Sequence, residues 1–410
     1  MEPITQPASG WNSCPEDIWF LVFKELSSAE HRALCLVNKH CRSIAEPFLY
    51  SKIQWTWQED HIDQSPRFSP LLRTLLSRPQ LAAYITTFHL DGNFVFLGWE
   101  RFRRHLATLP LADDALHQSI EFIHQTGVSY SDIWIEKIRQ GSIGALIALF
   151  SAQLPNVKCL YLSPDFTRET ALIGMVLRSA ILEPGSYRLP RFQDLREVTF
   201  MCRRAWDEIW EKKNTADVLP LFYPPNLQRM SAYIQNPKEW AWPAAQLPML
   251  LDLTSLDLAI IREGCLGKVL AATPNLETLR WEWLFDWGVW DRVFMTQTID
   301  LNKIAADLSH VRGTLTDLTI NAIMGISAPG DAFRPGLKAE GSLHALVDFD
   351  MIKRFECRGR FWWDLHKIER NDSAMSFPRT LNISQSLTTW RGKMMIEWRE
   401  IGLNTSGRTM

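Results

Sequence analysis

Apolar positions near the amino terminus follow a helical period that is wider than one buried face. In the stretch CPEDIWFLVFKEL (14–26), an arc of about 140° on the helical wheel holds Ile18, Trp19, Val22, Phe23 and Leu26. Phe20 and Leu21 fall outside this arc, on sides where water is expected. The helix therefore carries more apolar surface than its own fold needs to bury.

Two further short helices are expected after this one. Ser27 and Glu30 have the spacing of a capping box, which predicts a second helix carrying Leu34, Leu36 and Val37. A third helix around Ile44 and Ala45 is expected to end before Pro47, because the residue before a proline disfavours helical backbone. Three short helices in about 40 residues form too small a core to be secure alone. They need support from a partner, from the rest of the chain, or from both.

A second pattern begins near residue 71: an apolar helix, a break that often holds proline, and a short L-x-x-L-x-L strand. Full copies are LLRTLLSRPQLAAYITTFHL (71–90), GALIALFSAQLPNVKCLYL (144–162) and KVLAATPNLETLRW (268–281). The strand motifs begin at Ile85, Val157, Leu195, Leu227, Leu253, Leu276, Leu315 and Ile352. Gaps between these positions run from 23 to 72 residues, and the longest predicts a missed unit or a helical insertion across 99–140.

This repetition predicts an α/β fold in which an irregular solenoid similar to leucine-rich repeats follows the small helical unit. Leucine-rich repeats run ~20–29 residues, so several units here are long. An irregular α/β domain with alternating helices and strands is the alternative. Along each strand, residues between the motif's leucine positions should share the concave face. The candidate target-binding residues on that face are His89, Tyr161, Glu197, Arg229, Tyr233, Asp257, Arg280, Glu282, Asp317, Arg354 and Arg358.

Charge and composition restrict the classes of partner. The 410 residues are 46% hydrophobic with a formal net charge of −2, so no general attraction to nucleic acid or an anionic membrane is expected. The candidate concave face mixes both signs of charge, which favours a protein or peptide ligand. No apolar run is long enough to cross a membrane, and the first residues lack the basic and apolar regions of a signal peptide, so no secretory signal is expected. Seven cysteines without a C-x-x-C pair fit reduced thiols, so we expect a cytoplasmic or nuclear protein.

Motifs that carry chemistry are missing from the sequence. G-x-S-x-G, the G-x(4)-G-K-[ST] phosphate loop, G-x-G-x-x-G and H-E-x-x-H do not occur, so neither an enzyme nor a cofactor is predicted. His31, Cys35, His40 and Cys41 lack the paired spacing of a zinc site and are expected to pack. The basic run 101–105 reads as a solvated helix face. The tryptophan-rich stretch WEWLFDWGVW (281–290) is either core filler between unequal repeats or an aromatic binding pocket.

The order of motifs near the amino terminus resembles an F-box. The matching residues are Pro15-Glu16-Asp17-Ile18, Leu21-Val22-Phe23, Leu26 and then ALCLVNKHCRSIAEPFLY (33–50), so the resemblance covers roughly residues 13–53. Cys14 stands where the family usually has leucine, and His40-Cys41 stands where it usually has tryptophan. With its divergent carboxyl-terminal repeats, the chain resembles the group of fungal F-box proteins.

The resemblance implies a role in the ubiquitin conjugation pathway. F-boxes dock a Skp-family adaptor, which links them to a cullin, and the residues expected to face or support that contact are Pro15, Ile18, Leu21, Val22, Phe23, Leu26, Val37 and Leu49. The chain is then expected to be a non-catalytic substrate-recognition subunit of a Skp-cullin-F-box (SCF) ligase. A Skp-bound scaffold without ligase activity is the alternative. A purely structural alternative is that these apolar residues pack on the carboxyl-terminal domain of the same chain.

The predicted organisation has four parts. An F-box at 12–54 is followed by a linker and first helix at 55–80, a repeat domain at 81–402 and a polar tail at 403–410.

Overall fold

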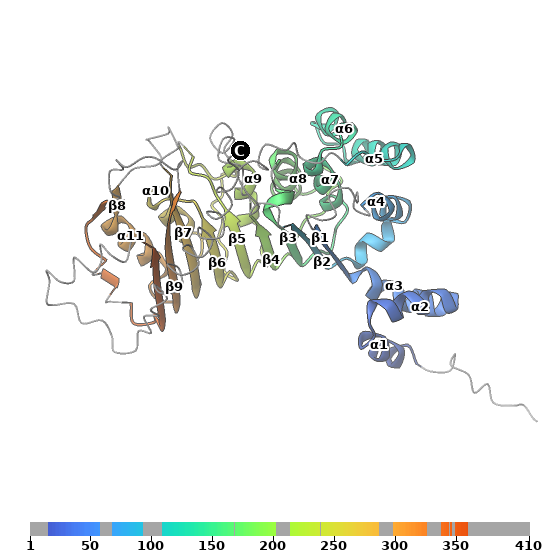
Figure 1. Ribbon diagram of the computed structural model, residues 1–410, viewed down its shortest axis with the longest axis horizontal. Coiled ribbons are helices and arrows are strands. Elements are labelled where there is room, and N and C mark those ends of the chain that lie inside the picture. The colour runs from blue at the N-terminus through green and yellow to red at the C-terminus, as the bar shows by residue number, and fades with distance from the viewer. Residues whose placement is uncertain are drawn as a thin grey trace, which may run out of the picture.

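The molecule is a mixed α/β protein built on a large parallel sheet (Figure 1). It is analysed as a computed structural model that describes residues 15–57, 68–92, 109–167, 169–201, 214–237, 239–286, 298–325, 338–343, 345–346 and 349–359. Predicted features at 93–108, including the basic run, and those beyond residue 359 lie outside the described residues.

Three helices form the N-terminal helical unit, which spans residues 16–51: α1 (Glu16–Lys24), α2 (Ser28–Val37) and α3 (Lys39–Ser51). Ser27 and Glu30 form the predicted capping box at the start of α2, with the Ser27 N–H donating to Glu30 Oε2 at 2.7 Å. Asn38 caps α3 by accepting from the Cys41 N–H at 2.7 Å. Side-chain caps therefore fix where both helices begin.

The prediction that the third helix ends before Pro47 is wrong. Helix α3 continues through Pro47 to Ser51. The residues around Pro47 are anchored by other contacts: the Phe48 ring lies 6.4 Å from that of Phe23, and Glu46 pairs with Arg78 at 2.7 Å. Packing and this ion pair thus offset the hydrogen bond that proline cannot donate.

Nine strands of the described chain form one sheet, and every hydrogen-bonded neighbour is parallel. In spatial order they are β1 (Lys52–Trp57), β2 (Thr87–Gly92), β3 (Cys159–Leu162), β4 (Glu197–Phe200), β5 (Arg229–Tyr233), β6 (Ser255–Ala259), β7 (Thr278–Asp286), β9 (Asp317–Gly325) and β11 (Arg354–Gly359). A second, two-stranded sheet pairs β8 (Thr298–Asp300) with β10 (Lys338–Glu340). Strand order follows chain order, so each strand of the large sheet is added beside the preceding one.

All eight predicted strands are present, and each begins two residues after the first leucine position of its motif. Strand β1 was not predicted. It pairs with β2 from Lys52 to Trp57 and crosses the expected domain boundary at residues 54–55. The N-terminal helical unit therefore runs directly into the sheet.

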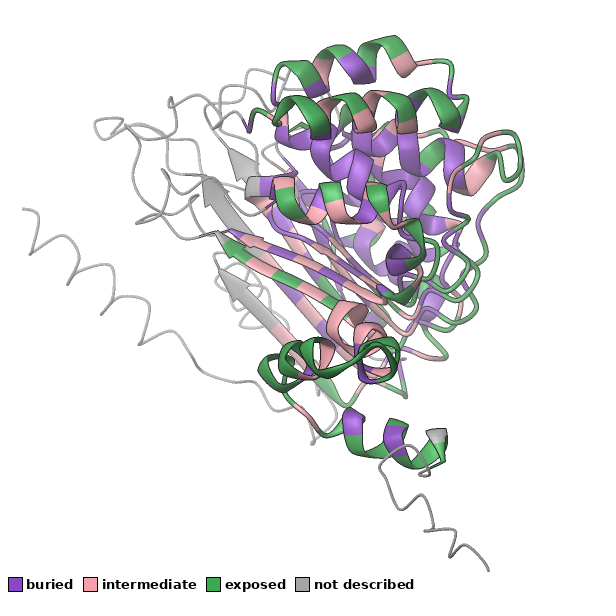
Figure 2. Ribbon diagram, turned by 90° about the vertical axis from the view of Figure 1, so that its right-hand side faces the viewer, coloured by how far each residue is buried: buried purple, intermediate pink, exposed green. Residues whose placement is uncertain are grey.

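The helices that connect the strands gather on one face of the sheet (Figure 2). Their bounds are α4 (Phe68–Ser77), α5 (Asp113–Thr126), α6 (Ser131–Arg139), α7 (Ile143–Ser151), α8 (Ala171–Leu182), α9 (Thr215–Val218), α10 (Glu263–Leu270) and α11 (Leu301–Leu308). Short 3₁₀ helices are η3 (Pro79–Tyr84), η6 (Pro164–Phe166), η7 (Leu219–Phe222) and η8 (Ser309–Val311). Because β2 pairs directly with β3, helices α5 and α6 are a helical insertion, as one of the two expectations for this gap proposed.

The core lies between these helices and the sheet. Burial alternates along the strands: in β2, Phe88 and Leu90 are fully buried, whereas His89 between them is half-buried. The buried strand residues share one hydrophobic cluster with helix residues such as Leu146 and Ile304. One face of the sheet is thereby sealed by helices, and the other presents the intervening side chains, which we call the open sheet face.

Three asparagines explain the Pro-Asn motifs that precede some strands. Their side-chain amides donate to backbone carbonyls of the preceding unit: Asn156 to Ala83 at 2.8 Å, Asn226 to Gln193 at 2.7 Å and Asn275 to Leu251 at 2.9 Å. Each acceptor lies two residues before the first position of the preceding motif. The same bond therefore joins successive units at three places.

Two tryptophans of the stretch 281–290 are core residues. Trp281 and Trp283 are buried, and their indole N–H groups donate to the Ile261 carbonyl and to Glu263 Oε2, both at 2.8 Å. The Arg262 guanidinium lies 4.0 Å from the Trp283 ring centroid. For these two residues the packing interpretation is confirmed, whereas the last two tryptophans of the stretch lie outside the described residues.

Within the described ranges, no helix combines the length and apolar character needed to cross a membrane.

Candidate functional site

Helices α1 and α2 expose large apolar side chains to solvent. On α1, Ile18, Leu21 and Val22 leave 47%, 59% and 50% of their surface exposed. Together these and the other exposed residues of the two helices form what we call the N-terminal apolar surface: Ile18, Phe20, Leu21, Val22, Leu36 and Val37. Because so many large apolar groups on two short helices face water, this surface is the strongest candidate for a protein contact.

The inward face of α1 differs from the predicted arc. Trp19 and Phe23 are buried and pack with Ala45 in a small separate core, whereas Ile18 and Val22 point outward. The inward face therefore follows the i, i+4 spacing of the two aromatic residues. Phe23, at 1% exposure, supports the fold from inside instead of offering a contact surface.

The remaining predicted contact residues are distributed around this core. Pro15 and Val37 are exposed, while Leu26 and Leu49 are half-buried, and Leu26 packs on the small core. Phe20 and Leu36 were left out of the predicted set although both are exposed. The sequence already indicated that Phe20 is exposed, because it falls outside the predicted apolar arc.

Three of the four residues considered for a zinc site pack inside the N-terminal helical unit, whereas His40 is exposed with its ring 6.4 Å from that of Trp19. The His31 ring is buried, its Nε2 lies 2.7 Å from the Phe23 carbonyl oxygen, and it stacks on Phe48 at 5.3 Å. Cys41 is buried and Cys35 half-buried. No cluster of three or more metal-ligating side chains occurs in the part of the chain that the structure describes.

Strand register brings the predicted target-binding residues into adjacent rows on the open sheet face. The first row reads, from β1 to β11, Lys52, Thr87, Cys159, Glu197, Arg229, Ser255, Thr278, Asp317 and Arg354. The middle row reads Gln54, His89, Tyr161, Thr199, Ser231, Asp257, Arg280, Thr319 and Glu356. Residues that are 23 or more positions apart in sequence thus become neighbours across the strands.

The first row neutralises much of its own charge. Arg229 pairs with Glu197 on the next strand, and Arg354 pairs with Asp317 at 2.8 Å. Both arginines are exposed, so each pair contributes about 0–1 kcal/mol to stability. These four charges are already partnered within the sheet.

The middle row contains an aromatic pair. The His89 and Tyr161 rings stack with centroids 4.0 Å apart and planes within 5° of parallel. Burial lowers the pKa of His89, an effect that Asp91 opposes, and burial raises the pKa of Tyr161. The stack adds aromatic surface to a row whose other residues are all polar.

In a third row, Tyr233 is less exposed than expected. From β5 to β11 this row reads Tyr233, Ala259, Glu282, Asn321 and Arg358. Tyr233 retains only 7% exposure, and the prediction that its side chain is available on the face is wrong. The alternation of burial ends there, since Ala232 and Tyr233 are buried in succession.

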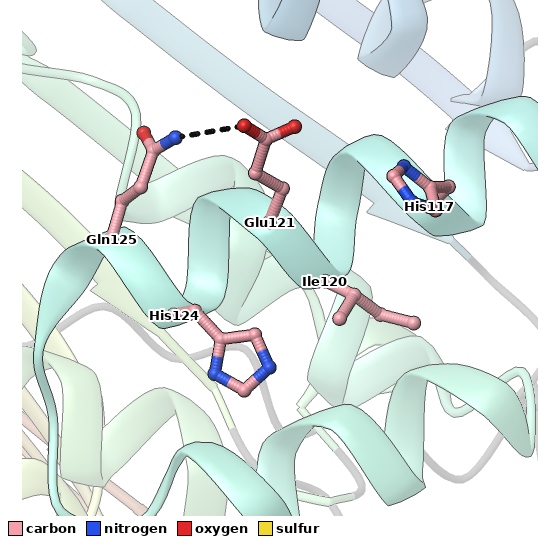
Figure 3. A pocket seen from close by; sticks show the side chains of 5 residues that line it. All are labelled: His117, Ile120, Glu121, His124 and Gln125. Atoms are coloured by element: carbon pink, nitrogen blue, oxygen red, sulfur yellow. Dashed lines mark hydrogen bonds between the residues drawn. The ribbon is translucent and has the colours of Figure 1, made fainter.

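A surface hollow of about 500 Å³ lies beside α5 (Figure 3). Its lining residues all come from this helix: His117, Ile120, Glu121, His124 and Gln125. Gln125 donates to Glu121 at 3.3 Å, and in Figure 3 His124 points away from that pair. A hollow lined by side chains of one helix that point in different directions offers no converging catalytic groups.

Comparison with known proteins adds no identification: no protein-family model matches the chain, and no curated protein sequence matches it. The N-terminal apolar surface and the open sheet face are therefore the features of the described chain that bear on its function.

Proposed function

We propose that this protein is a non-catalytic substrate-recognition subunit of an SCF-type ubiquitin ligase. In this proposal the N-terminal helical unit is an F-box that binds a Skp-family adaptor and, through it, a cullin. The open sheet face binds the target protein. The observation that carries the proposal is the exposure of Ile18, Leu21 and Val22 on a helix whose inward side is already filled by Trp19 and Phe23.

The division of α1 into two faces supports docking over self-packing. Trp19, Phe23 and Ala45 supply the small core, so the exposed aliphatic residues are not needed to hold α1 in place. Moving an exposed apolar side chain out of water lowers the free energy, and here that requires a partner that covers it. A folded partner with an apolar groove fits this requirement.

The long sheet supports the description of the later region as an LRR-like solenoid. Its strands follow chain order, burial alternates along strands such as β2, β3 and β4, and asparagine side chains join successive units. An irregular parallel array of this kind presents a broad surface suited to a protein ligand.

Contacts between the two regions favour a proximity mechanism. The Ser51 carbonyl at the end of α3 accepts from the Thr86 N–H at 2.9 Å, and Arg78 bonds Glu46 at 2.7 Å. Strand β1 joins the N-terminal helical unit to the sheet along six residue pairs. A rigid connection would keep a bound target at a fixed distance from the ubiquitin-transfer machinery and raise its effective concentration there. In this proposal the chain itself does not catalyse the transfer of ubiquitin. The proposed compartment is the cytoplasm or nucleus.

Reconstitution tests the proposal. The full chain is mixed with a purified Skp-family adaptor, a cullin and its RING partner, and the assembly is isolated through a tag on the chain. Recovery of adaptor and cullin together is the expected result. Recovery of the adaptor alone would favour the scaffold alternative, and recovery of neither would contradict the proposal.

A further inference from the structure

Asp257 and Arg280 form an unusual pair on the open sheet face. They lie opposite each other in the register of β6 and β7. Within the described chain neither side chain makes a hydrogen bond or an ion pair, although the first row joins its opposite charges as Glu197–Arg229 and Asp317–Arg354. One acceptor and one donor therefore stand side by side with their bonding capacity unused.

The environment of Asp257 makes a ligand contact favourable. Burial raises the pKa of Asp257, and the Arg280 charge opposes that rise only in part. A partly desolvated carboxylate has lost water contacts without a protein donor in exchange, which is costly. A donor from outside the chain would repay that loss. Arg280, which is exposed, can donate charge-assisted hydrogen bonds to an anionic group of the ligand.

The rest of the middle row supplies the other half of the site. Between Asp257 and the His89–Tyr161 stack lie only the hydroxyl residues Thr199 and Ser231. Strands in a sheet are about 4.8 Å apart. The centre of the His89–Tyr161 stack, between β2 and β3, is four strand spacings from the centre of the charged pair, between β6 and β7, which gives ~19 Å. An extended chain covers this distance in about six residues at ~3.3 Å each.

We propose that the open sheet face binds an extended segment of the target that crosses the strands, with an apolar or aromatic side chain on the His89–Tyr161 stack and a basic and an acidic side chain on Asp257 and Arg280. This inference rests on the proposed function, because it names the chemistry of the target. Alternate residues of an extended chain share a face, so an aromatic residue, a lysine six positions away and a glutamate two positions beyond it all point to the sheet.

Defined peptides provide the probe. An 11-residue fluorescein-labelled peptide carries Trp at position 2, Lys at 8 and Glu at 10 in a Gly/Ser background, and a reversed sequence covers the opposite chain direction. A second pair exchanges Lys and Glu. Fluorescence anisotropy with the full chain should show binding at least ~10-fold tighter for one peptide of the first pair than for its charge-exchanged counterpart.

Charge exchange in the protein separates a docking pair from a structural pair. Asp257→Lys combined with Arg280→Glu should invert the peptide preference. The matched control exchanges two exposed charges on the helical side, Glu136→Arg with Arg139→Glu, and should keep the original preference. If the exchanged chain does not fold, the single variants Asp257→Asn and Arg280→Gln replace it, and each should reduce the preference at least ~3-fold.

The outcomes are distinct. Equal binding of both peptide pairs, no binding of any peptide, or a preference unchanged by the exchange at Asp257 and Arg280 overturns the inference. Adaptor binding is measured on the same proteins. Loss of adaptor binding by the unaltered chain contradicts the proposed function, whereas normal adaptor binding with no peptide preference contradicts only this inference.

Discussion

Truncating the exposed side chains of α1 separates a docking role from a folding role. The variant carries Ile18→Ala, Leu21→Ala and Val22→Ala. All three residues lie on α1 with about half their surface exposed. Alanine is the best helix former, so the helix itself is retained. Only the apolar surface offered to a partner becomes smaller.

The expected loss follows from the exposed areas. Burying a whole aliphatic side chain is worth ~1.5–3 kcal/mol, so covering the exposed half of one is worth about 0.7–1.5 kcal/mol. Three such residues give roughly 2–4.5 kcal/mol, from which the contribution of the Cβ atoms that alanine keeps must be subtracted. A net loss of about 2 kcal/mol corresponds to roughly 30-fold weaker binding. The free energy of unfolding should change by no more than about 0.5 kcal/mol, because surface substitutions rarely do more.

The assay is calorimetric titration of a purified Skp-family adaptor into the full chain, with thermal unfolding followed in parallel by circular dichroism. The matched control is Ile133→Ala on α6, which removes an aliphatic side chain that is 54% exposed and lies on the helical insertion. It should leave the Kd unchanged.

Two results would refute this reasoning. Adaptor binding by the triple variant at the original Kd would show that these residues are not in the interface. A large drop in Tm for the triple variant would show that the exposed side chains stabilise the fold, so that weaker binding could not be assigned to lost contacts.

Three further predictions concern the fold and its charges. Phe23→Ala should destabilise the N-terminal helical unit by ~3–5 kcal/mol, seen as a separate unfolding transition, because the ring is fully buried; an unchanged melt would contradict that core. Asn226→Ala should lower the free energy of urea unfolding by about 0.5–1.5 kcal/mol through the lost bond to the Gln193 carbonyl, and no change would mean that the bond is not stabilising. Asp257→Asn should raise Tm at pH 7. Because burial raises the pKa of Asp257 above its unfolded value, the folded state loses stability as pH rises through that pKa; the Tm difference should vanish near about pH 3, and a constant difference would contradict the linkage.

The strands of the sheet could be predicted because their signal is local. Leu195, Leu227 and Leu253 each begin a motif whose apolar positions three and five residues further on are buried in the core. Strand β1 was not predicted, because KIQWTW directly follows a helix and lacks that leucine motif. Its Ile53 and Trp55 do alternate with exposed residues.

The faces of α1 could not be assigned from the sequence. Ile18, Trp19, Val22 and Phe23 are all apolar, and helical spacing alone allows any of them to point inward. The outcome depends on the packing of α1 against α3, where Ala45 leaves room for the two aromatic rings. That information resides in a contact between segments more than 20 positions apart.

Neighbours on the open sheet face were equally hidden. The candidate residues were recognised strand by strand, but units of unequal length conceal which residues meet. Only the register of β6 and β7 puts Asp257 beside Arg280, and only the register of β2 and β3 stacks His89 on Tyr161.

Hydrogen–deuterium exchange of the full chain, with and without a purified Skp-family adaptor, shows whether α1 is the docking surface. We expect slower exchange confined to the N-terminal helical unit, greatest in peptides that contain Ile18, Leu21 and Val22 on α1, with unchanged exchange across the large sheet. Slower exchange that spares α1, or none at all at a saturating adaptor concentration, would contradict it.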